Sequence, residues 1–372
     1  IDKKVFLLTG RYINEKTPQI YSVNKYYFND IFHENANNTN QKSENQMEFS
    51  GIEAHLLDKK NNGNLLEIKF GNQLRRDNLY SRFTLFENKN VISSPVNYQN
   101  CFTYSSTDLY LSAKYRFNFK KFTLLNQSDV HQLFNQLEKS NFKRNQTQFF
   151  IVPKIGINWV INEKNKILST YTYNTTNIDI LDIYSGYIQT GYNSFNKGIE
   201  EFNQLNASSA ILNYTFGNWT SNFFANTFIV YTKNNNFYST NSTITQNYTQ
   251  SNKIIVKDRN IVSIGSNIDR YFKSIKSTFK INIGVSETNF KNVVNNSNLR
   301  EVKNFNLTYG LEMRSSFSGI FNYNIGSKWN YNQIKSTTIN SNLDNMSFID
   351  LIFIFNDKLW AVYTHTHTTH TH

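Results

Sequence analysis

The chain has 372 residues and a formal net charge of +12, from 39 lysines and arginines against 27 aspartates and glutamates. No stretch approaches the roughly 18 apolar residues that a membrane-spanning helix needs, which excludes a helical membrane protein. The basic residues are scattered and no nucleic-acid-binding motif presents them, so we expect no nucleic-acid partner.

Alternation of apolar and polar side chains runs through most of the chain, in segments of about a dozen residues. Successive side chains on a β-strand point to opposite faces, so each segment predicts a strand with one apolar and one polar face. The pattern begins with a strand over 4–12. Seven hairpins follow, at 46–57/64–78, 105–118/122–135, 147–161/166–178, 205–216/219–233, 259–272/275–290, 303–314/320–335 and 346–355/359–370.

The connections between these strands alternate in length. Short turns rich in Asn, Gly, Lys, Asp and Ser close each hairpin, as at 118–121 and 217–218. Long polar connections are predicted between hairpins at 13–45, 79–104, 179–204 and 234–258, with shorter ones at 136–146, 291–302 and 336–345. Short turns on one side and long loops on the other are typical of transmembrane β-barrels. We therefore predict an all-β fold, an antiparallel transmembrane β-barrel over residues 1–372.

The apolar faces of these strands are rich in rings, and aromatic residues make up 16% of the chain. In a barrel such residues gather at the membrane interfaces. The lipid-facing rows are predicted to include Leu109, Leu111, Tyr115, Phe117 and Phe119, and also Trp219, Phe223, Ala225, Ile229 and Tyr231.

The predicted total of fifteen strands is odd, whereas bacterial single-chain barrels close with even numbers. If residues 1–12 form a rising strand, its hairpin partner lies upstream. The sequence thus indicates the C-terminal part of a larger barrel.

Five segments carry a resemblance to the barrel of TonB-dependent outer-membrane transporters of the Bacteroidota type: 7–12, 16–21, 166–173, 213–219 and 351–360. Such barrels have about 22 strands around a plug. The resemblance implies that the plug and the first strands precede this chain. It also implies uptake of a bulky, scarce ligand across the cell outer membrane, with outer-membrane lipid around the barrel and TonB engaged through the missing N-terminal region.

Two other readings remain open. The chain could be a structural or interaction barrel, an anchor or secretion-complex subunit that transports nothing itself and binds a surface lipoprotein or other subunits through its loops. It could also be a soluble, secreted β-sandwich or solenoid adhesin. A soluble adhesin would bury its apolar faces inside the protein, whereas both barrel hypotheses place these faces against lipid.

Charged side chains on the predicted lumen face are candidates for a ligand path: Lys114, Arg116, Lys154, Lys276, Lys280, Glu312, Arg314 and Lys328. Pairing across strands is the plainer role for such residues. No catalytic motif is present, so we expect no enzyme and no cofactor. The isolated His33, His55 and His131 and the tail 364–372 carry no carboxylate or cysteine support, so we predict no metal site.

Overall fold

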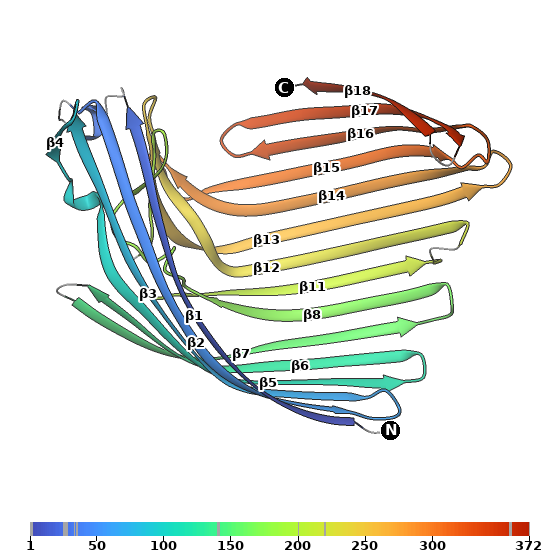
Figure 1. The fold of residues 1–372 in the computed structure, drawn as a ribbon, viewed down its shortest axis with the longest axis horizontal. Coiled ribbons are helices and arrows are strands. Elements are labelled where there is room, and N and C mark those ends of the chain that lie inside the picture. The colour runs from blue at the N-terminus through green and yellow to red at the C-terminus, as the bar shows by residue number, and fades with distance from the viewer. Residues whose placement is uncertain are drawn as a thin grey trace.

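The computed structural model describes residues 3–24, 29–32, 34, 36–139, 142–199, 201–218, 221–356 and 359–371. Within these ranges the chain is almost entirely β-structure, in one sheet (Figure 1). The elements are β1 (Lys3–Asn24), α1 (Asn29–Phe32), β2 (Asn38–Lys59), β3 (Leu65–Glu87), β4 (Asn90–Ser93), the 3-10 helix η1 (Val96–Tyr98), β5 (Gln99–Phe119), β6 (Phe122–Lys139), β7 (Phe142–Val160), β8 (Asn165–Asn177), β9 (Ile188–Gly191), β10 (Ser194–Lys197), β11 (Gln204–Phe216), β12 (Phe223–Ile244), β13 (Thr249–Phe272), β14 (Ser277–Val294), β15 (Arg300–Ser315), β16 (Phe321–Lys335), β17 (Ile339–Asn356) and β18 (Leu359–Thr371).

Fifteen of the described strands are long, and each pairs antiparallel with the next long strand along the chain. The remaining three, β4, β9 and β10, have four residues each and lie in connections. The predicted all-β antiparallel fold, with its first strand and seven hairpins, is confirmed. The helices described include none that is both long and apolar enough to cross a bilayer.

The register places like faces side by side across the whole sheet. Leu111 lies opposite Val130, and Ile281 lies opposite Leu311, on what we call the apolar face. Lys114 lies opposite Gln127 on the other face, which we call the polar face. Because side chains alternate with period two, a register fixed at one pair fixes the face of every residue in both strands. Of the predicted lipid-facing residues, Trp219 lies outside the described residues.

The strands extend far beyond the predicted segments. β1 runs on to Asn24, and β12 and β13 are joined by residues 245–248 alone, so most of the expected loops 13–45 and 234–258 is strand. The physical reason is that polar residues dominate these extensions and their apolar residues, such as Ile254, Ile255 and Val256, do not follow a period of two. They lose the alternation that identifies a strand, while their backbones keep pairing.

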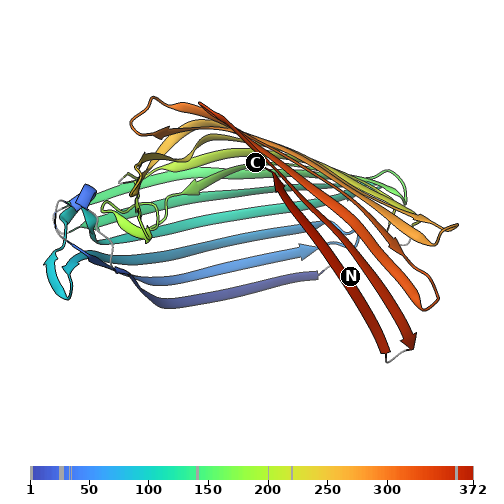
Figure 2. The same cartoon turned by 90° about the horizontal axis from the view of Figure 1, so that it is seen from above.

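The short turns of the seven hairpins lie at one end of the sheet, and the longer connections lie at the other end (Figure 1). At the turn end, Gly217 has a φ of +82°, and a Cβ there would stand 2.3 Å from the carbonyl oxygen of Phe223. Only glycine fits this turn. Seen from above, the sheet is strongly twisted, and the red C-terminal strands cross the direction of the earlier ones (Figure 2).

The sheet is open. Among the described residues, β1 pairs only with β2, and β18 pairs only with β17, so each leaves one edge without a β-partner. Among the described residues, the buried core consists of two clusters at the end with the long connections, where residues 178–199 and 201–203 fold back onto the polar face. The rest of the sheet has no second layer in the described part of the chain.

Candidate functional site on the polar face

The structure places seven of the eight predicted ligand-path residues on the polar face. The strand register shows which of these residues share a face. Lys114 lies opposite Gln127, which lies opposite Lys154, and Lys280 lies opposite Glu312. The seven are Lys114, Arg116, Lys154, Lys280, Glu312, Arg314 and Lys328.

Lys276 is the exception, and its predicted place in a strand is wrong. It lies in the turn between β13 and β14 with a φ of +44°. This left-handed conformation closes the hairpin, so the strand begins one residue later, at Ser277.

The seven residues do not form one site. Lys114, Arg116 and Lys154 lie on β5 and β7, whereas the other four lie on β14, β15 and β16. In the first group, Lys114 Nζ is 3.3 Å from Glu67 Oε2. The same carboxylate lies 3.6 Å from Lys69 and 3.2 Å from His55. Lys114 therefore takes part in a network of cross-strand charge pairs within the wall, the plainer of its two expected roles.

Three residues of the second group border a hollow at the end of the sheet with the short turns. Lys280, Glu312 and Arg314 contribute to its lining, together with Asp269. Lys280 lies opposite both Asp269 and Glu312 in register. This part of the polar face alternates positive and negative charge and presents no single sign to a ligand.

A feature that we did not predict crosses the polar face at the opposite end. Residues 178–199, which we call the strap, follow β8 and carry β9 and β10. At one end the strap is seated on β2, β3 and β5. Asp179 Oδ1 lies 3.3 Å from Arg75 Nη2 on β3. On β5, Asn100 Oδ1 accepts from the amides of Ser185 and Gly186, at 3.1 and 2.7 Å.

A second set of contacts joins the strap to β13. β10 pairs parallel with β13, Ser194 opposite Thr249 and Lys197 opposite Asn252. Asp182 forms an ion pair with Lys253, whose Nζ also donates to the carbonyl oxygen of Leu181 at 3.2 Å. The strap is therefore held by strands far apart in the sheet.

These contacts show how sharply the sheet curves. Along the sheet, β3 and β13 are separated by β5, β6, β7, β8, β11 and β12, which is roughly 34 Å at about 4.8 Å per strand. Asp179 and Asp182 are three residues apart, a span of at most roughly 10 Å. Both ion pairs can exist only because the polar face is concave here and brings the two walls toward each other.

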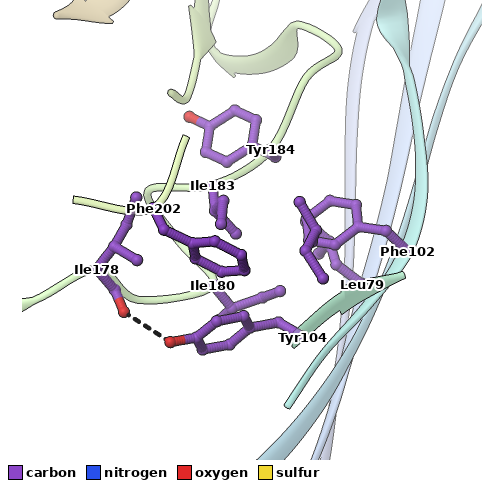
Figure 3. Close-up of a cluster of buried hydrophobic side chains, with 9 residues drawn as sticks. Leu79, Phe102, Tyr104, Ile178, Ile180, Ile183, Tyr184 and Phe202 are labelled. Carbon is purple, nitrogen blue, oxygen red and sulfur yellow. Dashed lines mark hydrogen bonds between the residues drawn. The ribbon is translucent and has the colours of Figure 1, made fainter. Parts of the chain in front are cut away.

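Buried apolar side chains also hold the strap against the sheet. Ile178, Ile180, Ile183 and Tyr184 pack with Phe202 against Leu79, Phe102, Tyr104 and Leu137 of the wall (Figure 3). The Tyr104 hydroxyl donates to the carbonyl oxygen of Ile178 at 3.1 Å. Burial, with a smaller contribution from Asp182, raises the pKa of Tyr184 to about 12. An apolar run inside a predicted polar loop is the sequence signal that could have identified this segment.

No cluster of three or more metal-ligating side chains occurs in the described ranges. His365 and His367 lie on the apolar face, while His370 turns to the polar face, where its Nδ1 lies 2.8 Å from Asp344. His33 and His372 lie outside the described residues. His131 stacks on Phe150 and pairs with Asp108 at 2.9 Å, and His55 belongs to the Glu67 network.

Aromatic rings on the apolar face form two rows. Near the short turns, ring pairs join neighbouring strands: Phe122–Trp159, Phe216–Phe223, Phe272–Phe279 and Phe321–Phe353. Further along the strands, Tyr309 stacks on Trp329 with centroids 4.9 Å apart, and Phe305 meets Tyr331 at 6.3 Å. Leucine, isoleucine and valine fill much of the face between the rows, where Leu111 and Ile283 are 44% and 47% exposed.

No family model and no curated protein matches this chain. Solved structures with a similar arrangement include the copper transporter OprC, which is 8% identical with a TM-score of 0.48 over 92% of this chain and 59% of OprC. The alcaligin outer-membrane receptor FauA from Bordetella pertussis is 11% identical, with a TM-score of 0.43 over 99% of this chain and 64% of FauA. The iron transporter FrpB from Neisseria meningitidis is 10% identical, with a TM-score of 0.44 over 98% of this chain and 68% of FrpB. The chain thus spans about three fifths of OprC and FauA.

Proposed function

We propose that this chain forms much of the wall of an outer-membrane transport barrel, with the apolar face in lipid and the polar face lining the lumen. The spacing of the two aromatic rows carries the proposal. On β7 the outward rings of Phe149 and Trp159 are ten positions apart, as are those of Phe321 and Tyr331 on β16. Ten residues at about 3.4 Å, tilted by about 40°, rise roughly 26 Å. An outer-membrane barrel presents an apolar band about 25 Å tall between two aromatic girdles.

The exposed apolar surface also favours a membrane over a soluble sandwich or solenoid. Side chains such as Phe70, Leu111, Phe149 and Ile283 are each more than two fifths exposed, and they belong to a band that crosses the sheet. Monomeric soluble proteins rarely expose contiguous apolar patches of more than a few hundred Å². Lipid would cover this band without any second protein layer.

The open edges indicate that further strands complete the barrel. β1 and β18 each offer a row of backbone donors and acceptors, and such groups cannot stay unpaired in lipid. We propose that residues 1–372 are the C-terminal part of the barrel and that about seven more strands bring the fifteen seen here to about 22, the number in plugged transporters. A plug would then precede those strands.

Within such a barrel, the proposed activity is TonB-dependent uptake of a bulky, scarce ligand, without catalysis. The polar face supplies a charged lumen, and the strap crosses it at the end with the long connections. A second candidate is a structural or interaction barrel. The strap supports this alternative, because a lumen crossed by a fixed segment suits an anchor that transports nothing.

Depth-dependent quenching of tryptophan fluorescence tests the membrane assignment. Full-length protein would be prepared with Trp159 or Trp329 as its single tryptophan and reconstituted with lipids carrying quenchers at different depths. Both should be quenched best by shallow quenchers, since one residue lies in each row. A variant retaining only Trp360, which shares the polar face with Ile354, should be quenched much less. Equal quenching of all three variants would contradict the two-faced wall.

Capture of the periplasmic domain of TonB by the full-length protein separates the two candidate functions. An importer should bind that domain, and more strongly when its ligand is present. Absence of binding, in a protein whose Trp159 and Trp329 do report membrane insertion, would favour the structural barrel.

A further inference from the structure

The strap carries two carboxylates that are paired with bases on opposite walls. Asp179 meets Arg75 on β3, and Asp182 meets Lys253 on β13. A third base faces the same segment from β6, since Lys139 Nζ donates to Ser185 Oγ at 2.8 Å. Three cationic side chains from three strands thus converge on about seven consecutive residues of the strap.

The charge balance changes if the strap leaves. In the observed state Arg75 and Lys253 supply two positive charges, and their partners Asp77, Asp179 and Asp182 supply three negative ones. Asp77 belongs to the wall and stays with Arg75, 2.7 Å from its Nε. Removing the strap takes away two of these three negative charges, so the net charge of the set changes from −1 to +1 and Lys253 loses its carboxylate partner.

We propose that the strap is an autoinhibitory segment whose two aspartates occupy a polyanion-binding site formed by Arg75 and Lys253, with Lys139 beside it. We call the ion pairs Asp179–Arg75 and Asp182–Lys253 the latch. The role of the strap in ligand passage through the barrel rests on the transport function proposed above, whereas the latch and the polyanion site do not. A ligand carrying two or more carboxylate or phosphate groups competes with Asp179 and Asp182 and releases the strap. Carboxylates and phosphates are the groups that guanidinium and ammonium donors recognise best.

Partial burial lets the latch act as a switch. The side chains of Asp182 and Lys253 are 19% and 32% exposed, so the pair is desolvated enough to matter and open enough to be reached. Fully exposed ion pairs contribute little to stability. The buried apolar contacts between the strap and the sheet contribute more to its attachment than the ion pairs do. We therefore expect the strap to open locally while the sheet stays folded.

Hydrogen exchange of strap amides in the full-length protein, in detergent micelles, tests the latch. Asp182→Lys should speed exchange of the peptide covering 179–191 by about fivefold or more, and the swap Asp182→Lys/Lys253→Asp should restore slow exchange. The matched control is Glu287→Lys, which breaks the 2.8 Å ion pair with Lys303 on the other face and should leave the strap unchanged. An unchanged rate in Asp182→Lys, or a swap that does not restore protection, would overturn the latch.

Competition by defined anions tests the site. Citrate and pyrophosphate should each speed exchange of the same peptide by about fivefold over sodium chloride of equal ionic strength, and Lys253→Met should reduce this excess. If neither anion exceeds sodium chloride, or if Lys253→Met leaves the excess unchanged, the polyanion site is refuted. Both readouts are independent of membrane insertion, so this proposal and the proposed function can fail separately.

Discussion

Asp77 is a carboxylate with no exposed side-chain surface, and its charge is compensated mainly by one neighbour. Arg75 contacts it through Nε at 2.7 Å and Nη2 at 3.3 Å, and Asn45 donates to it at 3.2 Å. Burying a charge is costly unless it is paired, and removing one partner of a buried pair leaves that cost uncompensated. Arg75 thus links wall stability to the strap, since it also contacts Asp179.

Arg75→Met should therefore lower the free energy of unfolding by about 2–4 kcal/mol, measured by urea titration of the full-length protein in micelles. Arg76→Met is the matched control, because Arg76 is the next residue but lies on the opposite face and is exposed. Its effect should stay within about 0.5 kcal/mol. Similar losses in both variants would mean that Asp77 does not depend on Arg75.

At the scale of the element, each strand is an alternating sequence whose two faces meet different surroundings. Neighbouring positions on β14 make the contrast testable, since Ile283 lies on the apolar face and Asn282 on the polar face. Both positions lie in the middle of the strand, between Phe279 near one aromatic row and Glu287 beyond the band.

Ile283→Arg should destabilise the folded barrel by about 2–4 kcal/mol, because an arginine at the bilayer midplane meets hydrocarbon. Asn282→Arg should be tolerated, since the polar face meets water. The measurement is the fraction of protein that assembles in outer membranes and keeps the compact, heat-sensitive mobility of a folded barrel on unboiled gels. Equal tolerance of both substitutions would indicate that water reaches both faces.

The strands also show why sequence reasoning succeeded in one part and failed in another. In the proposed barrel, lipid on one side and water on the other impose the period-two pattern inside the band, and hairpins such as β15–β16 were placed to within a few residues. Beyond the band, the regular contrast between an apolar and a polar face is lost from the sequence. The extensions of β1, β12 and β13 were therefore read as loops.

At the scale of the whole molecule, the unpaired edges of β1 and β18 dominate. Edges of 22 and 13 residues invite pairing, and in lipid they require it. We therefore predict that the native polypeptide carries additional strands that join β1 to β18, preceded by a plug.

Intact mass and peptide mapping of the protein from its native membrane test this prediction. We expect roughly twice the 43.6 kDa of this chain, with peptides from upstream strands and a plug. A mass close to 43.6 kDa would require a second subunit to supply the missing strands, and cross-linking between subunits would then be expected.

The sequence by itself determined the antiparallel meander, its seven hairpins and the faces of the residues inside the predicted strands. These follow from local alternation, which the two surroundings of each strand impose directly. Only the tertiary structure decided how the wall curves, which cations meet which carboxylates and where the connection after β8 goes. The pairing of Asp179 with β3 and of Asp182 with β13 depends on bringing together strands that are roughly 34 Å apart along the sheet. No local pattern encodes that closure, because it arises from the summed twist and curvature of many strands.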